Sequence, residues 1–387
     1  MKSILDTVVI GGGAMGSAAA WALARRGRQV TLLEQFGPGH RIGASHGSTR
    51  NLNPGYDRPE YVAMLAEGLA LWEELEQDSG ERLLTRTGIV NHGPDPRFKL
   101  VQAALTEAGI RAEFLRPDEA AERWSGIRFD QQVLYMPDGG QLNPEAALPA
   151  FQRLAAARGA EIRHHTKVVD LEIMDDGVRL TLESGGAEAG GAGGTGRTEV
   201  VTAAQAVVTA GGWTEKLLSG AARSGMLRIP RLRVTQEQPA HFRVADQGAV
   251  WPGFNHMPGT GPAYKDWYSP VYGMQTPGEG IKAGWHGVGP EVDPDKRSFL
   301  PEPVQLAALQ DYARTWLPGV DADSFEAISC TYTTTPDEDF ILDRIGPVVI
   351  GAGFSGHGFK FTPVVGRILA DLATGTRPAP QIFSATR

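Results

Sequence analysis

Three glycines near the start of the chain have the spacing of a loop that holds phosphate groups. They form the pattern Gly11-x-Gly13-x-x-Gly16, and Glu34 follows eighteen residues after the last of them. In such a loop the first glycine makes a tight turn, the second lets backbone N–H groups approach a pyrophosphate, and the third lets a helix pack on a strand. The acidic residue accepts hydrogen bonds from ribose hydroxyls. The pattern therefore predicts a dinucleotide site, and it leaves the choice between NAD and FAD open.

A second glycine cluster lies near the other end of the chain. Gly351-x-Gly353-x-x-Gly356 also follows an apolar run, but no strand that ends in an acidic residue comes after it. We interpret it as a loop whose backbone passes close to a flat group, followed by a helix from Pro363. If that group is a flavin, the helix dipole and Lys360 would favour the anion formed on its reduction. A plain turn leading into a helix is the alternative.

The composition disfavours several other kinds of chemistry. The net charge of −8 argues against a nucleic-acid or anionic-membrane partner, because both are normally met by an excess of Lys and Arg. Cys330 is the single cysteine, so no intramolecular disulfide can form. The nine histidines lack a spacing such as His-Glu-x-x-His, and we expect no metal. No secretory leader precedes the first strand and no window of ~18 apolar residues could span a bilayer. We therefore expect a cytoplasmic protein.

The elements that must position these residues begin with a βαβ unit. We expect a strand over residues 8–10, a helix over 17–26 and a second parallel strand over 30–34. Apolar residues recur every three or four positions over 61–76, which predicts a surface helix, and another helix is expected over 144–158.

The rest of the chain mixes strands with turns. Residues 185–196 are so rich in glycine that we interpret them as a flexible hairpin tip between two strands. The remaining expectations are paired strands within 168–182, a buried strand over 206–213 that enters a glycine turn, a mostly antiparallel sheet within 229–289, a strand over 348–350 and a helix over 363–374.

Four stretches occur in a specific order along the chain. They are Gly11 to Gly16 with Glu34, Ser45 to Arg50, Gly280 to His286, and Cys330 to Thr333 running on to Gly353 to Phe361. In order and spacing they resemble the monomeric sarcosine oxidase and N-methyltryptophan oxidase family, flavoenzymes of the D-amino-acid-oxidase superfamily. The resemblance implies an FAD-dependent oxidase of secondary or tertiary amines, with an N-methyl or cyclic amino acid as substrate. The products would be an imine, which hydrolyses to aldehyde and amine, and hydrogen peroxide.

The resemblance also implies the roles of individual residues. FAD would be attached covalently through Cys330, and Lys282 would stand beside the flavin and activate dioxygen. Arg50 would lie over the flavin ring, and Tyr272 and His286 would complete the catalytic set near the substrate. The residues expected at the FAD are Gly11, Gly13, Ala14, Met15, Gly16, Glu34, Ser45, His46, Thr49, Arg50, Val168, Gly211, Trp213, Cys330, Gly353, Gly356, His357, Gly358 and Lys360. The residues expected at the substrate are Lys360, Asn53, Tyr272 and His286.

Asn53 departs from the family pattern. The family places an arginine here, which binds the substrate carboxylate together with the residue equivalent to Lys360. An amide supplies hydrogen bonds but no charge, so sarcosine itself should bind weakly. We expect a bulkier amine with one acidic group, held partly by Tyr272 or Trp285.

The predicted fold is α/β with an α+β substrate domain. A Rossmann-like FAD-binding domain would collect residues 1–85, 145–215 and 325–387, because both glycine clusters must meet one cofactor. A mostly antiparallel β-sheet substrate domain would take 86–144 and 216–324.

Other functions remain as alternatives. One is a flavin-dependent amine dehydrogenase, for which Lys282 would have no purpose; another is a biosynthetic tailoring oxidase that acts on a larger amine without the usual carboxylate. A flavin-bound protein without turnover is the alternative outside the enzymes. The expected partners are a small-molecule amine and dioxygen, with no nucleic acid and no membrane, and the expected state is a monomer.

Overall fold

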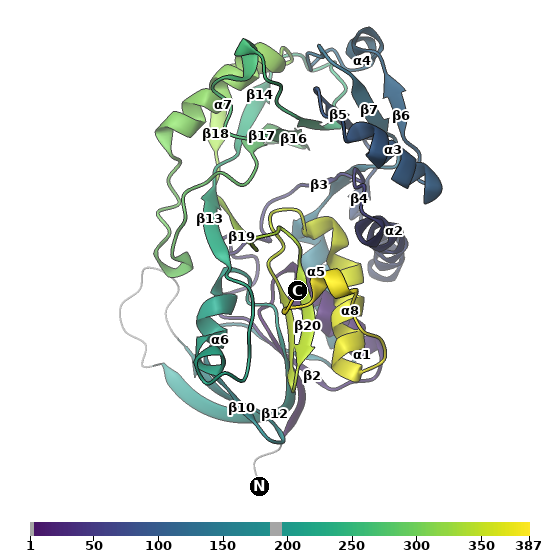
Figure 1. The fold of residues 1–387 in the computed structure, drawn as a ribbon. Coiled ribbons are helices and arrows are strands. Elements are labelled where there is room, and N and C mark those ends of the chain that lie inside the picture. Colours follow the sequence, from purple (N-terminus) through teal and green to yellow (C-terminus); the bar gives the residue numbers. More distant parts are fainter. Residues whose placement is uncertain (1–3, 186–195) are drawn as a thin grey trace.

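The computed structural model describes residues 4–185 and 196–387, and two eight-stranded sheets dominate it. The first sheet forms the lower half in Figure 1 and the second sheet the upper half. The strands of the first sheet are β1 (Leu5–Ile10), β2 (Val30–Leu33), β9 (Glu161–Arg163), β10 (Thr166–Met174), β11 (Gly177–Ser184), β12 (Arg197–Val208), β20 (Ile341–Ile345) and β21 (Val348–Ala352). Their order is β10-β11-β12-β1-β2-β9, and β21 lies on β12 with β20 beside it.

The centre of the first sheet is parallel. Strands β21, β12, β1, β2 and β9 pair in parallel, whereas β10 and β11 pair antiparallel at the edge. β2 and β21 are buried along their whole length, and this is why their sequences are mainly apolar and do not alternate with polar residues. The α/β prediction for this half is therefore confirmed.

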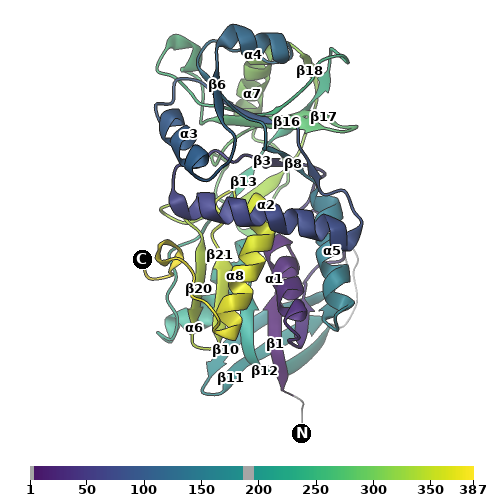
Figure 2. The same ribbon diagram turned by 90° about the vertical axis from the view of Figure 1, so that its right-hand side faces the viewer.

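Helices cover both faces of this sheet. α1 (Ala14–Arg25), α5 (Pro144–Ala156) and α8 (Thr362–Thr374) pack side by side on one face, and α2 (Pro59–Ser79) crosses above them (Figure 2). α6 (Thr214–Arg223) lies on the other face, against β10.

The first helix begins earlier than the sequence predicted. α1 starts at Ala14 and not at Ser17, because Gly13 takes an extended conformation and acts as the N-cap. The helix N-terminus therefore lies directly behind the glycine turn, which is where a pyrophosphate would be bound.

The second sheet is mostly antiparallel, as predicted. Its strands are β5 (Ile89–His92), β6 (Glu113–Leu115), β7 (Val133–Met136), β14 (Ala240–Val244), β15 (Gly253–His256), β16 (Val271–Thr276), β17 (Gly280–Trp285) and β18 (Val320–Ala327). The order is β18-β14-β17-β16-β15-β5-β7-β6, and only the β5–β15 pair is parallel. The helices α3 (Phe98–Glu107), α4 (Pro117–Arg123) and α7 (Pro303–Trp316) belong to this upper half (Figure 1).

Two small sheets connect the halves. β3 (Arg50–Leu52) and β4 (Leu84–Thr85) flank β8 (Gly140–Leu142), and β13 (Arg233–Glu237) pairs with β19 (Cys330–Thr334) between the two large sheets (Figure 1). Short 3-10 turns complete the description: Gly211–Trp213, Pro262–Tyr264, Pro294–Lys296, Phe359–Phe361 and Gln381–Phe383.

Most of the predicted glycine-rich hairpin tip lies outside the described residues. Its flanking strands β11 and β12 pair antiparallel up to Ser184 and Arg197, as expected, and residues 186–195 are not described. In the described ranges, no helix has the length and apolar character needed to cross a membrane.

A pair of histidines is buried in the core of the second half. The rings of His92 and His256 stack with their centroids 3.8 Å apart, and both side chains are fully shielded from solvent. Burial lowers the pKa of His92 to about 3 and lowers that of His256 as well. Trp267 and Trp316 contact His256 edge-on, so both imidazoles are neutral groups inside an aromatic core.

Candidate active site

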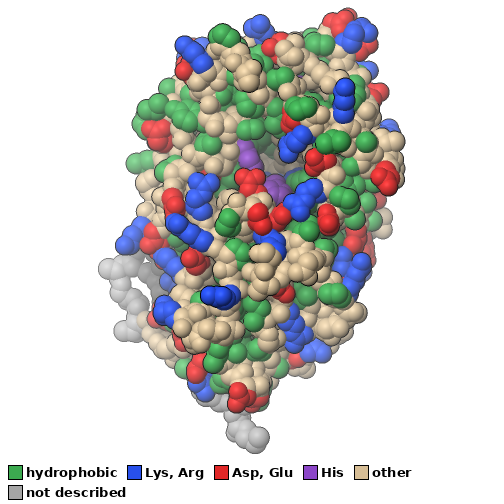
Figure 3. All heavy atoms as spheres, viewed as in Figure 1, with side chains coloured by type: hydrophobic (Ala, Val, Ile, Leu, Met, Phe, Trp, Pro, Cys, Tyr) green, Lys and Arg blue, Asp and Glu red, His purple; other side chains and the backbone are tan. Residues whose placement is uncertain are grey.

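One large cavity of about 1530 Å³ lies between the two halves of the molecule. Figure 3 shows its opening as a hollow with histidine side chains inside and charged side chains around it. Pockets for drug-sized ligands are roughly 300–1,000 Å³, so this one has room for a dinucleotide together with a second small molecule.

The cavity gathers the predicted site residues from both halves. Those that line it are Gly11, Gly13, Ala14, Met15, Glu34, Ser45, His46, Thr49, Arg50, Asn53, Val168, Gly211, Trp213, Tyr272, Lys282, His286, Cys330, Gly353, Gly356, His357, Gly358 and Lys360. Gly16 does not line the cavity. A Cβ at Gly16 would lie 1.8 Å from the carbonyl oxygen of Gly11, so this glycine serves the close packing of α1 on the turn.

The glycine turn after β1 lines the cavity and is packed closely against Thr209. Gly11 has a φ of +100°, and a Cβ there would lie 2.5 Å from the carbonyl oxygen of Thr209. Ser45 closes the turn from the other side, because its hydroxyl accepts a hydrogen bond from the Ala14 N–H at 3.0 Å. The turn and the N-terminus of α1 thus form a backbone cradle suited to a pyrophosphate.

Glu34 is held firmly at the end of β2. One carboxylate oxygen accepts from the Gly12 N–H at 2.6 Å, and the other accepts from the Phe36 N–H at 2.9 Å. The side chain is 6 % exposed and lines the cavity. Each oxygen retains a lone pair, so the carboxylate can also accept from ribose hydroxyls.

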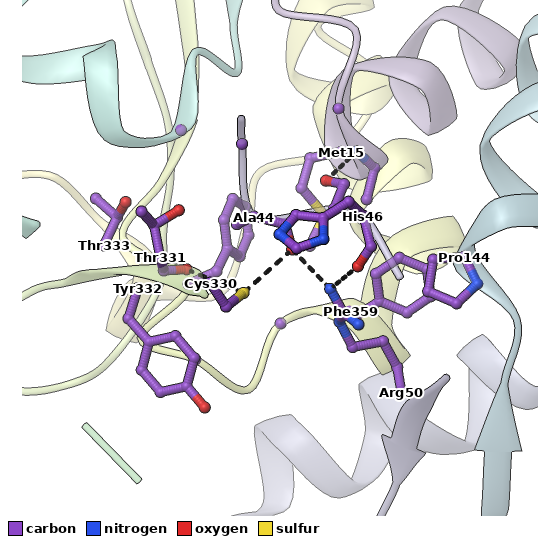
Figure 4. A pocket seen from close by; sticks show the side chains of 18 of the residues that line it. Met15, Ala44, His46, Arg50, Pro144, Cys330, Thr331, Tyr332, Thr333 and Phe359 are labelled. Atoms are coloured by element: carbon purple, nitrogen blue, oxygen red, sulfur yellow. Dashed lines mark hydrogen bonds between the residues drawn. The ribbon is translucent and has the colours of Figure 1, made fainter. Parts of the chain in front are cut away.

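Arg50 ties down the loop in front of the cradle. Its guanidinium donates to the carbonyl oxygens of Ala44 at 2.9 Å, Thr49 at 2.8 Å and His46. The Cys330 thiol lies 3.9 Å from the same Ala44 oxygen, so Arg50 and Cys330 meet on one carbonyl (Figure 4). Burial, together with the charge of Arg50, lowers the pKa of His46 to about 3. His46 is therefore neutral beside the thiol.

Lys282 is a buried ammonium on β17. It is 5 % exposed, and its Nζ donates to the Thr49 carbonyl oxygen at 3.2 Å and the Thr49 hydroxyl at 3.4 Å. Burial lowers its pKa to about 7, and the charge of Arg50 adds to this effect. Within the described residues no carboxylate forms an ion pair with it. Its charge is consequently available to a group inside the cavity.

Lys360 is a second buried ammonium, on the turn that leads into α8. Its Nζ donates to the Tyr56 hydroxyl and to the His357 carbonyl oxygen, both at 2.9 Å, and lies 5.1 Å from the centre of the Tyr56 ring. Burial lowers its pKa to about 7. In the described part of the chain it also lacks an acidic partner, so its charge is not neutralised by a neighbouring carboxylate.

Aromatic and imidazole groups form a neutral wall next to these cations. The Tyr332 hydroxyl lies 3.4 Å from His286 Nδ1, and the rings of Tyr272 and His286 are 6.4 Å apart. Burial lowers the pKa of His286 to about 4, helped by the charge of Lys360. Trp285 does not belong to this wall, contrary to expectation. Side chains alternate along a strand, so Lys282 points into the cavity while Trp285 packs into the core on the opposite face of β17.

Sequence reasoning missed several residues at the site. The Tyr56 hydroxyl accepts from Lys360, and the Tyr332 hydroxyl contacts His286. Arg297 donates to the Cys330 carbonyl oxygen at 3.4 Å and to the Ser329 hydroxyl at 2.8 Å. Tyr332 lies inside the stretch that carried the family resemblance and could have been found there. Arg297 comes from a loop without periodicity, and nothing in the sequence connects it to Cys330.

The comparisons with known proteins agree with this geometry. A family model described as FAD dependent oxidoreductase (DAO) matches residues 6–372. The chain belongs to this family. It is 32% identical to a monomeric sarcosine oxidase of Bacillus sp. (strain NS-129), over 100% of this chain and 98% of that protein. It is 28% identical to the N-methyl-L-tryptophan oxidase of Salmonella newport (strain SL254), over 97% and 96% of the two chains.

Solved structures give the same fold. NikD, described as an unusual amino acid oxidase essential for nikkomycin biosynthesis, has a TM-score of 0.82 at 25% identity and covers 99% of this chain and 98% of its own. The L-proline dehydrogenase of P. horikoshii has a TM-score of 0.81 at 22% identity, over 100% and 98%, which shows the fold alone.

The residues present fit FAD, the cofactor of this family. Gly13 lines the cavity, and beyond its chain neighbours a Cβ there would meet only the Ser45 hydroxyl, so a side chain would fill space beside the backbone. The Glu34 carboxylate lines the same cavity and can accept from ribose hydroxyls. The described residues contain no cluster of three or more His, Cys, Asp or Glu side chains that could hold a metal ion.

Proposed function

We propose that this protein is an FAD-dependent oxidase of secondary or tertiary amines, with an N-methyl or cyclic amino acid as substrate and dioxygen as electron acceptor. The products are an imine, which hydrolyses to aldehyde and amine, and hydrogen peroxide. The full-length similarity to sarcosine oxidases and an N-methyl-L-tryptophan oxidase supports the substrate class. The observation that carries the proposal is the pair of buried ammonium groups, Lys282 and Lys360, on one cavity beside the glycine cradle.

Bound FAD supplies a hydride acceptor for the C–H bond next to the amine nitrogen and passes two electrons on to dioxygen. The chain itself orients the substrate. Lys360 would hold its carboxylate, because the ammonium is buried and has no acidic partner in the described residues. Tyr272 and His286 would lie on either side of the reacting carbon. Because His286 is neutral, it would not hold the substrate amine in its protonated form.

Lys282 would serve the second half of the reaction. Negative charge develops on dioxygen as it is reduced, and a fixed cation in a site without bulk water stabilises that charge. A dehydrogenase that passes electrons to a protein or quinone would not need this cation, so Lys282 disfavours that alternative.

We further propose that FAD is bonded to the Cys330 sulfur. The thiol lines the cavity and lies 3.9 Å from the Ala44 carbonyl oxygen that Arg50 also contacts, in the wall next to the glycine cradle. Arg50 would act on the cofactor through the loop 44–49 that it holds.

The molecule is proposed to be a cytoplasmic monomer of two discontinuous domains with the boundaries given above. The two large sheets divide the chain in nearly that way, but β18 crosses the proposed boundary at residue 325, and α6, which packs on β10 of the first sheet, crosses the one at residue 215. A single thiol suits a reducing compartment.

A peroxide-release screen tests the function. Holoenzyme would be assayed with sarcosine, larger N-methyl amino acids and cyclic amino acids, and with matched amines that lack the carboxylate. The expected result is peroxide in equal amount to amine consumed, with the carboxylate required. Flavin that is reduced by the amines but not reoxidised by dioxygen would point to a dehydrogenase.

A further inference from the structure

Four asparagines meet at one side of the cavity. Asn51 lies in β3, Asn53 follows that strand, Asn91 lies in β5 and Asn255 in β15. Asn91 and Asn255 are direct neighbours in the parallel β5–β15 pair, so their side chains share a face. Asn51, Asn53 and Asn255 line the cavity, whereas Asn91, 3 % exposed, lies behind them. We call these four residues the amide wall.

Hydrogen bonds join the four carboxamides into one network. Asn91 Oδ1 accepts from Asn53 Nδ2 at 3.1 Å and from Asn255 Nδ2 at 2.9 Å. Asn255 Oδ1 in turn accepts from Asn51 Nδ2 at 3.2 Å. Asn91 is therefore the central acceptor that orients two lining side chains.

A single backbone group fixes the direction of this network. The Gly55 N–H donates to Asn53 Oδ1 at 2.9 Å, so that atom must be the oxygen of the amide. Once Asn53 is fixed, its Nδ2 must donate to Asn91 Oδ1, and the orientations of Asn255 and Asn51 follow.

The amide wall offers hydrogen-bond donors but no charge. Each Nδ2 carries two hydrogens, and the bonds above use one from each of Asn51, Asn53 and Asn255. Asn51 Oδ1 is buried against Gly253 without a hydrogen-bond partner among the described residues, so a ligand in the cavity does not reach it. An apolar ligand group would leave the amide donors unsatisfied, and a carboxylate would lose its hydration there without meeting a cation.

We propose that the amide wall is a subsite for an uncharged group that accepts hydrogen bonds, the carbonyl oxygen of a carboxamide on the substrate, with Asn91 as its positioning residue. This inference rests on the proposed function and names the substrate class: an N-methyl amino acid whose side chain ends in a carboxamide. The substrate carboxylate goes to Lys360, and the side-chain amide goes to Asn53, Asn255 and Asn51.

Three substrates of similar shape test the proposal. The holoenzyme would be assayed with N-methyl-L-asparagine, N-methyl-L-leucine and N-methyl-L-aspartate. We expect kcat/KM for the amide to exceed that for the leucine analogue by about tenfold or more, since a site built to hydrogen-bond rejects an analogue that cannot. Equal values for the amide and the leucine analogue would overturn the proposal in favour of an apolar subsite. A preference for aspartate would overturn it in favour of an anion subsite.

Variants test the roles of Asn255, which lines the cavity, and of Asn91, which lies behind it. Asn255→Leu and Asn91→Leu should each lower the amide-to-leucine ratio by about tenfold, mainly through KM. Asn91→Asp keeps the oxygen that both neighbours donate to but replaces Nδ2, which donates to Asn53 Oδ1 at 3.4 Å, with a second oxygen, so it should restore only part of the ratio. Met257→Leu, an apolar exchange at the same side of the cavity, is the matched control and should leave the ratio unchanged. A ratio that survives Asn91→Leu would remove Asn91 from the positioning role.

A binding measurement keeps the test independent of turnover and of variant folding. Succinamate and 4-methylpentanoate have similar shapes and the same carboxylate, and their binding to wild-type holoenzyme would be compared by calorimetry. The proposal expects succinamate to bind about tenfold more tightly. If neither N-methyl nor cyclic amino acids yield peroxide, the proposed function fails. If peroxide forms but neither the substrates nor the acids show the amide preference, only the amide wall fails.

Discussion

The cofactor side of the cavity is formed mainly by backbone groups, whereas the substrate side is formed by side chains. On the cofactor side, Gly11, Gly13 and the N-terminus of α1 come from one continuous segment, and Glu34 lies at the end of the next strand. On the substrate side, Asn91, Asn255 and other side chains converge from strands that are far apart in the sequence.

This difference has a consequence for mutation. A backbone cradle does not depend on which side chains surround it, so it is common to relatives with different substrates. A wall of side chains can change its hydrogen-bonding character by one substitution. Changes on the cofactor side should therefore affect all substrates equally, and changes on the substrate side should alter which substrate is preferred.

The largest expected effect lies on the cofactor side, at Cys330. The wild-type protein should keep its yellow colour in the pellet after acid precipitation, whereas Cys330→Ser should release all of its flavin, because the thioether cannot form. Absorbance of pellet and supernatant measures this directly. Equal release from both proteins would show that no covalent bond exists.

Lys282→Met should slow reoxidation by dioxygen by about 10² to 10³-fold, while reduction by substrate changes far less. The two half-reactions would be followed separately by stopped-flow absorbance, with every substrate giving the same loss. Lys265→Met, at an exposed lysine, is the control. Equal slowing of both half-reactions would remove Lys282 from dioxygen chemistry.

On the substrate side, Lys360 should make ligand binding depend on pH. Burial lowers its pKa to about 7, so the ammonium loses its proton above that pH and the attraction for a carboxylate falls. The dissociation constant of 4-methylpentanoate should rise towards tenfold per pH unit above about 7. Lys360→Met should bind weakly at every pH, whereas Lys282→Met should retain the pH dependence. A flat profile in the wild type would contradict a carboxylate at Lys360.

The smallest effect is expected at Asn53, and it should depend on the substrate. Asn53→Arg adds a guanidinium for the carboxylate and should raise kcat/KM for sarcosine by up to about tenfold, because a charged bidentate donor replaces a neutral one. The same change removes one amide from the wall, so N-methyl-L-asparagine should lose efficiency. If the wild type already oxidises sarcosine as efficiently as larger N-methyl amino acids, another group replaces the missing arginine.

The sequence was informative wherever chemistry is carried by a local pattern. Glycine positions and apolar periodicity predict the glycine turn, the βαβ unit and the helix α8, and the structure contains all three. Alternation along β17 could also have separated Lys282 from Trp285, and the expectation that Trp285 reaches the substrate was wrong because that alternation was not applied.

Long-range contacts were outside the reach of such patterns. The amide wall depends on the parallel pairing of β5 with β15, and no local signal reports that two strands more than a hundred residues apart are neighbours. Tyr56 and Arg297 were missed for the same reason, since each acts on a partner far along the chain.

The stacked His92–His256 pair makes the free energy of unfolding depend on pH. Both imidazoles have a folded-state pKa below the usual 6.5, so between that pH and about 3 the unfolded chain binds more protons than the folded one. Stability therefore falls as the pH drops through this range, by up to about 1.4 kcal/mol per pH unit for each histidine. The two histidines in the aromatic core of the upper half thus make the folded state less stable in acidic surroundings than at neutral pH.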